Sequence, residues 1–101
     1  MNEFSLRTPE QARDDLAARV KQLRLIRGWK QSTLARRSGV SLGSLRRFET
    51  SGKISFESLL KLAFVLDRLD DFDSILNPPP AATMAELEAS LARPQRKRGR
   101  E

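Results

Sequence analysis

The sequence contains no cysteine and no histidine among its 101 residues. Zinc sites in proteins are built mainly from these two side chains, and the usual Ser-His and Cys-His catalytic arrangements need at least one of them. Their absence excludes such sites. We therefore expect a protein that is not an enzyme and that holds no metal and no cofactor.

Long apolar runs are absent as well. No stretch approaches the roughly 20 residues that a membrane-spanning helix needs, and the N-terminus shows no signal-peptide pattern. The lack of cysteine fits a reducing compartment without establishing it. We expect a cytoplasmic protein with no membrane association. A chain of 101 residues provides one domain with a single modest core and short tails.

Acidic residues are scarce in one part of the chain. Residues 19–53 hold ten Lys or Arg side chains against the single Glu49, a net charge of +9. Residues 1–18 carry −2, residues 54–92 carry −5 and residues 93–101 carry +4. A run of charge usually marks only a solvated face. Here the positive block coincides with a helical motif, which favours a surface that binds phosphates.

That motif spans residues 31–49, QSTLARRSGVSLGSLRRFE, and its apolar spacing predicts two short helices joined by a tight turn. Gly39 stands where the first helix should end, because glycine takes the left-handed conformation without a side-chain clash. Ser41 can cap the second helix with its hydroxyl group. Leu45 and Phe48 face inward at a spacing of three, so other residues of the second helix face outward. These are Leu42, Gly43, Arg46 and Arg47. The layout is that of a helix-turn-helix whose second helix enters a DNA groove.

The motif resembles the lambda-repressor-like (Xre/Cro) helix-turn-helix family. The residues that carry the resemblance are Gln31, Leu34, Ala35, Gly39, Val40, Ser41, Leu45 and Glu49, preceded by Arg24, Arg27 and Gly28. The resemblance covers roughly residues 16–76. It implies an all-α, five-helix domain that binds double-stranded DNA. The alternative is a helical hairpin that merely packs.

Two arginines dominate the predicted DNA contact. Arg46 and Arg47 are the best donors to guanine edges, and Leu42 can meet a thymine methyl group. Gly43 weakens a helix by about 0.5 to 1 kcal/mol relative to alanine, and a close approach to DNA would explain its presence. By resemblance Gln31 contacts the DNA backbone, whereas Arg36 is equally well explained as a solubilising charge. The predicted DNA-binding residues are Gln31, Arg36, Ser41, Leu42, Gly43, Ser44, Arg46, Arg47 and Lys53.

The resemblance also implies a structural pair. Arg24 would pair with Glu49 and tie the first helix to the end of the recognition helix. The alternative is a solvent-exposed arginine, and an exposed pair would contribute at most about 1 kcal/mol. Trp29 is expected in the core, closing over the helix that begins near Gln31, rather than as a stacking platform for nucleic-acid bases.

The flanking segments predict further helices. Thr8, Pro9 and Gln11 form a capping-box start for a helix that should run to about Arg27. Its buried stripe should comprise Ala12, Leu16, Val20 and Leu23, widened by Leu25 and Ile26. A fourth helix, from Phe56 to about residue 66, is apolar around much of its circumference, so we expect it to be the most buried. A short fifth helix follows, which in related repressors forms the dimer contact. The candidates for that contact are Phe72, Ile75 and Leu76, and the alternative is that they only complete the core.

The domain should occupy residues 8–76, after a flexible arm at residues 1–7. Residues 77–80, NPPP, form a stiff extended spacer. Met84, Leu87 and Leu91 then give a narrow apolar stripe on a short extra helix, which is marginal alone and should pack on something. Residues 93–101, RPQRKRGRE, lack apolar side chains and should form a disordered basic tail until they meet an anion.

A single recognition helix contacts too few base pairs for useful specificity, so we expect a homodimer on an inverted-repeat operator. The Pro-rich exit, the LEASL segment and the basic end make the chain similar to HipB-like antitoxin repressors. That similarity implies autoregulation within a toxin–antitoxin module and a HipA-type kinase toxin as a partner. Two alternatives are a free-standing phage-type or chromosomal repressor and an interaction module that no longer binds DNA. The outward Arg46 and Arg47 disfavour the second alternative.

Overall fold

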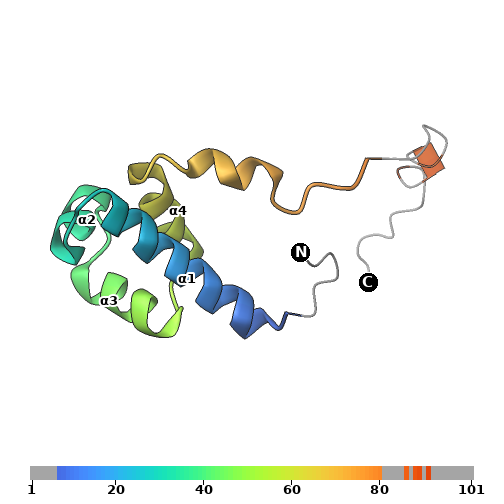
Figure 1. Cartoon of the computed structure of the whole chain (residues 1–101). Helices are drawn as coiled ribbons and strands as arrows, with labels where there is room; N and C mark the ends of the chain where they lie inside the picture. Colours follow the sequence, from blue (N-terminus) through green and yellow to red (C-terminus); the bar gives the residue numbers. More distant parts are fainter. Residues whose placement is uncertain (1–6, 81–85, 87, 90, 92–101) are drawn as a thin grey trace.

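The computed structural model describes residues 7–80 together with residues 86, 88, 89 and 91. In this part of the chain, four α helices and one 3-10 helix follow one another without a strand. They are α1 (Pro9–Ile26), α2 (Gln31–Ser38), α3 (Leu42–Ser51), α4 (Phe56–Val65) and η1 (Leu69–Ser74). The helix α1 packs against α3, and α2 packs against both α3 and α4, so that the four α helices form one unit (Figure 1). The all-α, five-helix prediction is confirmed, and the fifth helix is of the 3-10 type.

Local sequence signals set the helix ends. Thr8 Oγ1 accepts a hydrogen bond from the Gln11 backbone N–H at 3.1 Å, and the Gln11 side chain accepts from the Thr8 N–H at 3.0 Å. This completes the predicted capping box of α1. Gly39 ends α2 with a φ of 79°, and Ser41 begins α3 by accepting from the Ser44 backbone N–H at 3.1 Å. A left-handed stop followed at once by a cap produces the tight turn between α2 and α3.

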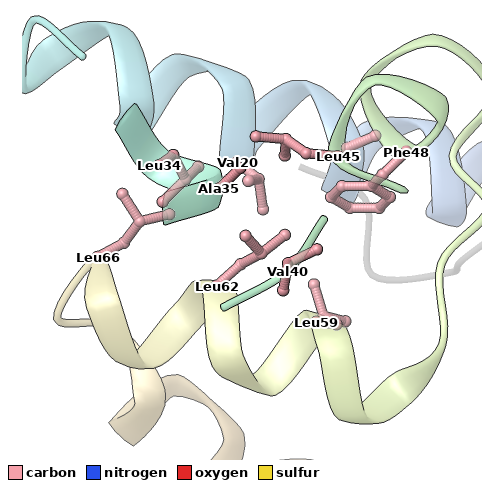
Figure 2. Packing of buried hydrophobic residues seen from close by; sticks show 10 residues of the cluster. Val20, Leu34, Ala35, Val40, Leu45, Phe48, Leu59, Leu62 and Leu66 are labelled. Carbon is pink, nitrogen blue, oxygen red and sulfur yellow. The ribbon is translucent and has the colours of Figure 1, made fainter. Parts of the chain in front are cut away.

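A single core joins the four α helices, and Figure 2 shows side chains from each of them meeting there. Val20 of α1, Leu34 of α2, Leu62 of α4 and the pair Leu45 and Phe48 of α3 are each at most 5% exposed. Burying a side chain of this size contributes about 1.5 to 3 kcal/mol. The helix α3 is therefore held through its inner face, and its outer face stays free.

The predicted stripe of α1 is partly wrong. The buried residues of this helix are Ala17, Val20 and Arg24, whereas Ala12 is exposed and Leu25 and Ile26 are 56% and 74% exposed. Successive helical residues are about 100° apart around the axis. Leu25 and Ile26 therefore point away from the face on which Arg24 packs.

The helix α4 has the largest share of buried residues among the α helices, three of ten against three of eighteen in α1, two of eight in α2 and two of ten in α3, as expected. Its apolar circumference is nevertheless covered on one side only. Leu59, Leu62 and Ala63 face the core, but Phe56 and Phe64 are 63% and 68% exposed. Among the described elements, α4 packs against α2 and η1, so only part of its circumference is covered. The apolar residues on its other side form surface rather than core.

Some predictions about the chain ends lie outside the described residues. They concern the arm at residues 1–6, Met84 and Leu87 of the short extra helix, and the basic tail at residues 93–101. Within that expected helix, residues 86, 88, 89 and 91 are helical and exposed. No helix in the described part of the chain is long and apolar enough to cross a membrane.

Candidate nucleic-acid interface

The outer face of α3 is polar and basic. Leu45 and Phe48 anchor the helix in the core at 0% and 1% exposure, so the opposite side faces solvent. Its exposed residues are Gly43, Ser44, Arg46, Arg47 and Thr50. Leu42 is half-buried and packs against the core, and only part of its side chain is left to contact a base.

Arg46 and Arg47 keep their guanidinium groups free. Neither forms an ion pair within the described residues. The Thr50 and Ser51 hydroxyl groups donate to the backbone carbonyls of Arg46 and Arg47 at 2.6 and 2.7 Å. Those bonds close the last turn of α3 without using the arginine side chains. A free guanidinium can donate two parallel hydrogen bonds to a guanine edge or to a phosphate.

Two exposed serines stand at the start of α3. Ser41 Oγ accepts from the Ser44 backbone N–H and donates to Ser44 Oγ at 2.9 Å. Because Ser44 Oγ is the acceptor in this pair, its own O–H remains a donor for a ligand. Hydroxyl groups and helix N-termini are common partners of DNA phosphates, so this end of α3 suits the DNA backbone.

An open polar hollow lies beside Arg47, between α3 and the start of α4. Its lining residues are Ser44, Arg47, Lys53, Ile54, Ser55 and Ser58. Ser55 Oγ already accepts from the Ser58 backbone N–H at 3.1 Å. The strongest groups left for a ligand are therefore the cations of Arg47 and Lys53. A DNA phosphate lying along α3 would meet both of them.

A buried hydrogen-bond network behind α3 fixes its position. Glu49 Oε2 accepts from Arg24 Nε at 2.8 Å and Glu49 Oε1 accepts from Arg24 Nη2 at 3.0 Å, and the two side chains are only 5% and 8% exposed. Arg24 Nη1 donates to the Trp29 carbonyl at 2.8 Å. Gln31 Nε2 donates to Glu49 Oε1 at 2.9 Å. The network therefore joins α1, α2 and α3. Because the Arg24–Glu49 pair is bidentate, it also fixes the orientation of the two side chains relative to each other.

A family model described as helix-turn-helix matches residues 20–71, slightly more than half of the chain. The chain belongs to the Xre/lambda-repressor-like helix-turn-helix family. This is a family of DNA-binding transcription regulators rather than of enzymes. No curated protein and no solved structure matches the chain.

Three other predicted residues take distinct positions in this helix-turn-helix domain. Gln31 is half-buried, and its bond to Glu49 leaves one amide hydrogen for a phosphate. Arg36 and Lys53 are exposed. Lys53 lines the hollow between α3 and α4 together with Arg47. The structure therefore brings Lys53 together with Arg47 and gives Gln31 a structural partner.

Trp29 is half-buried and packs against the core, as predicted. The guanidinium groups of Arg37 and Arg27 lie 4.8 and 5.2 Å from the centre of its ring. Attraction between a cation and an aromatic face contributes about 0.5 to 1 kcal/mol at exposed sites. With two arginines against its ring, Trp29 acts as a packing residue of the helix-turn-helix domain.

The three dimer candidates do not share one environment. Phe72 is half-buried against the core, and its ring meets that of Phe56 edge-on with centroids 6.2 Å apart. Ile75 and Leu76 are 49% and 95% exposed. Phe72 thus takes the core position that was the alternative, while Ile75 and Leu76 are accessible to another molecule.

Two features of the site escaped the sequence interpretation. The bond from Gln31 to Glu49 was not expected, although the expected Arg24–Glu49 pair already placed Glu49 near the turn before α2. The hollow was missed as well. Its only signal is that Ser55, whose hydroxyl group caps α4, follows Lys53 by two residues.

Proposed function

We propose that the protein represses transcription by binding an inverted-repeat operator as a homodimer. The observation that carries the proposal is the pair of exposed guanidinium groups of Arg46 and Arg47, which form no ion pair with another described residue, on a helix anchored in the core. Two such helices, related by a twofold axis, would enter successive major grooves about 34 Å apart. A dimer bound across a promoter excludes other proteins from the same DNA, and the expected outcome is repression.

In this proposal the start of α3 approaches the bases closely. A Cβ atom built at Gly43 meets no protein atom within 4 Å, so packing inside the protein does not require glycine there. The close approach of DNA explains the residue. Arg46 and Arg47 then contact guanine edges, and the exposed part of Leu42 meets a thymine methyl group.

The remaining polar groups hold the DNA backbone. Lys53 takes a phosphate in the hollow between α3 and α4, and Ser41 and Ser44 supply hydroxyl groups at the start of α3. Arg36 and the second amide hydrogen of Gln31 contact the backbone from α2. These contacts position the protein on the duplex but carry no sequence information.

The test is a titration of the purified full chain against the DNA upstream of its own gene, with random DNA of equal length as the reference. We expect a protected inverted repeat and tighter binding to it than to random DNA at physiological salt. Lys61→Ala serves as a control variant. It removes one cation from α4, at a position whose side chain is 50% exposed and which lies outside the proposed DNA surface, so it should bind the operator as the unchanged protein does. Equal affinity for every DNA tested would contradict the proposal.

An antitoxin role within a HipBA-like module is the second candidate function. It is favoured by the Pro-rich exit, the LEASL segment and the basic end, which resemble HipB-like repressors. The adjacent gene and a tagged pull-down test it. Recovery of a HipA-type kinase with the full chain would support the role. If the protein binds its own operator, but no such kinase is encoded next to its gene or recovered with the chain, the protein is a free-standing repressor.

A further inference from the structure

An apolar groove lies on the side of the molecule formed by α1, α4 and η1. Its volume is about 400 Å³. The apolar lining includes Leu16, Leu23, Ile26, Leu59, Phe72 and Ile75. Ile26 and Ile75 at its edge are 74% and 49% exposed. An apolar surface of this kind, open to water, is usually covered in the working form of a protein.

The chain itself supplies a segment that fits the groove. Residues 81–92 carry Met84, Leu87 and Leu91 at spacings of three and four, which form one narrow apolar stripe on a helix. Leu91 is 71% exposed, so the rest of its own chain does not bury it. A helix of this length gains stability only by packing its stripe on another surface.

Charge around the groove matches that segment. Arg19 and Arg68 lie in its lining with Asp71, and Arg68 pairs with Asp71 at 2.9 Å. Arg19 forms no ion pair within the described residues. The segment 81–92 carries two acidic residues, Glu86 and Glu88, and no basic one. An acidic helix beside an unpaired arginine is an electrostatically favourable arrangement.

The spacer at residues 77–80 directs residues 81–92 away from the groove of the same subunit. The chain leaves the groove lining at Ile75, and Figure 1 shows the described chain after η1 leading away from the α helices. Asn77, Pro78 and Pro79 each precede a proline, which restricts them to extended backbone. Three prolines at about 3.1 Å per residue carry the chain roughly 9 Å outward before it can turn. A second subunit is therefore the more accessible place to dock.

We propose that residues 81–92 of one subunit dock in the α1, α4 and η1 groove of the other subunit. The proposal rests on the homodimer proposed above and names the segment that holds it together. Ile75, at the groove edge, then contacts the incoming segment. Each subunit gives one segment and receives one, so the exchange is closed by the twofold axis.

The absence of cysteine from the chain allows a direct test. Gln22→Cys places a thiol at the groove edge and Ser90→Cys places one beside the apolar stripe, and neither change removes an apolar contact. The two full-length variants, carrying different tags, are mixed, equilibrated and treated with a short bismaleimide. We expect a covalent heterodimer. Lys61→Cys, on the exposed side of α4, replaces Gln22→Cys in the control mixture and should give only background.

A chain that carries both Gln22→Cys and Ser90→Cys distinguishes docking within a subunit from exchange. Efficient linkage within one chain, without a covalent heterodimer in the mixture, would overturn the exchange. Background linkage in both experiments, from a protein that sedimentation shows to be dimeric, would overturn the groove as the docking site. A protein that sediments as a monomer would instead refute the homodimer itself, so the two failures are separable.

The stripe can also be broken without touching the groove. Leu87→Glu together with Leu91→Glu in the full chain should weaken dimerisation by about tenfold or more, because two apolar contacts are lost, and should abolish the Gln22–Ser90 linkage. The helical circular-dichroism signal of the domain should persist. Unchanged dimerisation and linkage would contradict the proposal. Phe64→Glu, a matched apolar-to-acidic change at an exposed position of α4 outside the groove, should leave both unchanged.

Discussion

The side of the molecule that carries α3 and the side that carries η1 differ in both charge and polarity. Residues 19–53, which include α2 and α3, have a net charge of +9, whereas residues 54–92 have −5. The outer face of α3 is polar, and its exposed guanidinium groups have no ion-pair partner in the part of the chain that the structure describes. The surface around η1 exposes Ile75 and Leu76 at 49% and 95% beside a cluster of aspartates. One surface suits a polyanion and the other suits a protein.

The contrast has a physical reason. DNA attracts cations and repels acids, so the acidic residues of η1 would weaken binding if they lay beside α3. These residues are Asp70, Asp71 and Asp73, together with Asp67 in the preceding turn. A dimer contact has the opposite need, because apolar area there supplies the driving force. Separating the two surfaces would let the proposed homodimer form while both subunits bind DNA.

The largest expected effect comes from the buried network that holds α3 to α1 and α2. Glu49→Ala should destabilise the domain by about 3 to 5 kcal/mol, because it leaves the Arg24 guanidinium buried and unpaired. Chemical denaturation of the variant measures this free energy. Glu57→Ala is the control, since Glu57 pairs with Lys61 at a position 83% exposed and should cost less than about 1 kcal/mol.

A double-mutant cycle sharpens this result. Arg24 and Glu49 touch directly, so their coupling energy should exceed about 0.5 kcal/mol. If the effects of Arg24→Ala and Glu49→Ala simply add, the pair does not hold the helices together in solution.

The next effect concerns the α3 surface alone. Arg47→Ala should weaken operator binding by about 1 to 3 kcal/mol and relax the preference at one base pair. Fluorescence anisotropy on the operator and on single-base variants measures both. Folding stability should not change, because the exposed Arg47 side chain forms no ion pair among the described residues. Equal weakening on operator and random DNA would make Arg47 a phosphate contact, as its place in the hollow with Lys53 also allows.

Gly43 separates folding from DNA binding at one position. Gly43→Ala should stabilise the domain by about 0.5 to 1 kcal/mol, because glycine disfavours a helix and the new methyl group meets no protein atom. The same change should weaken operator binding if DNA lies against the α3 backbone. Thermal melting and anisotropy on one protein sample test both signs. Improved stability with unchanged affinity would place the DNA farther from Gly43.

The sequence was sufficient for the parts of the molecule that depend on local signals. The capping residues Thr8 and Ser41 and the left-handed Gly39 set helix ends wherever they occur, so α1, α2 and α3 were predicted nearly to the residue. Burial depends on which elements meet. Ile26 and Phe64 carry apolar side chains at exposed positions, because no described helix covers those faces. Helical periodicity shows that a face is apolar, but not whether it is covered.

The residues of the candidate site likewise separate into those that local spacing predicts and those that depend on tertiary packing. Arg46 and Arg47 were predicted to face outward because Leu45 and Phe48 fix the inner side of α3. The second role of Gln31 could not be predicted, since its bond to Glu49 depends on the angle between α2 and α3. Long-range hydrogen bonds of this kind follow from tertiary packing and have no signal in the spacing of residues along one helix.

The smallest expected effect concerns the basic tail at residues 93–101. Changing it tests whether the DNA-binding charge of the α3 side is supplemented by the end of the chain. RPQRKRGRE has charge but no fixed geometry for base edges, so it should add electrostatic affinity without specificity. Each phosphate it neutralises steepens the dependence of log K on log salt by about 0.9. Replacing Arg96, Lys97 and Arg98 by glutamine in the full chain should therefore flatten that slope and weaken operator and random DNA alike. Lys61→Gln, which removes a cation from α4, should leave the slope unchanged. If the tail variant keeps its slope but loses a protein partner in a pull-down, the tail serves a protein complex, and the antitoxin role gains over the free-standing repressor.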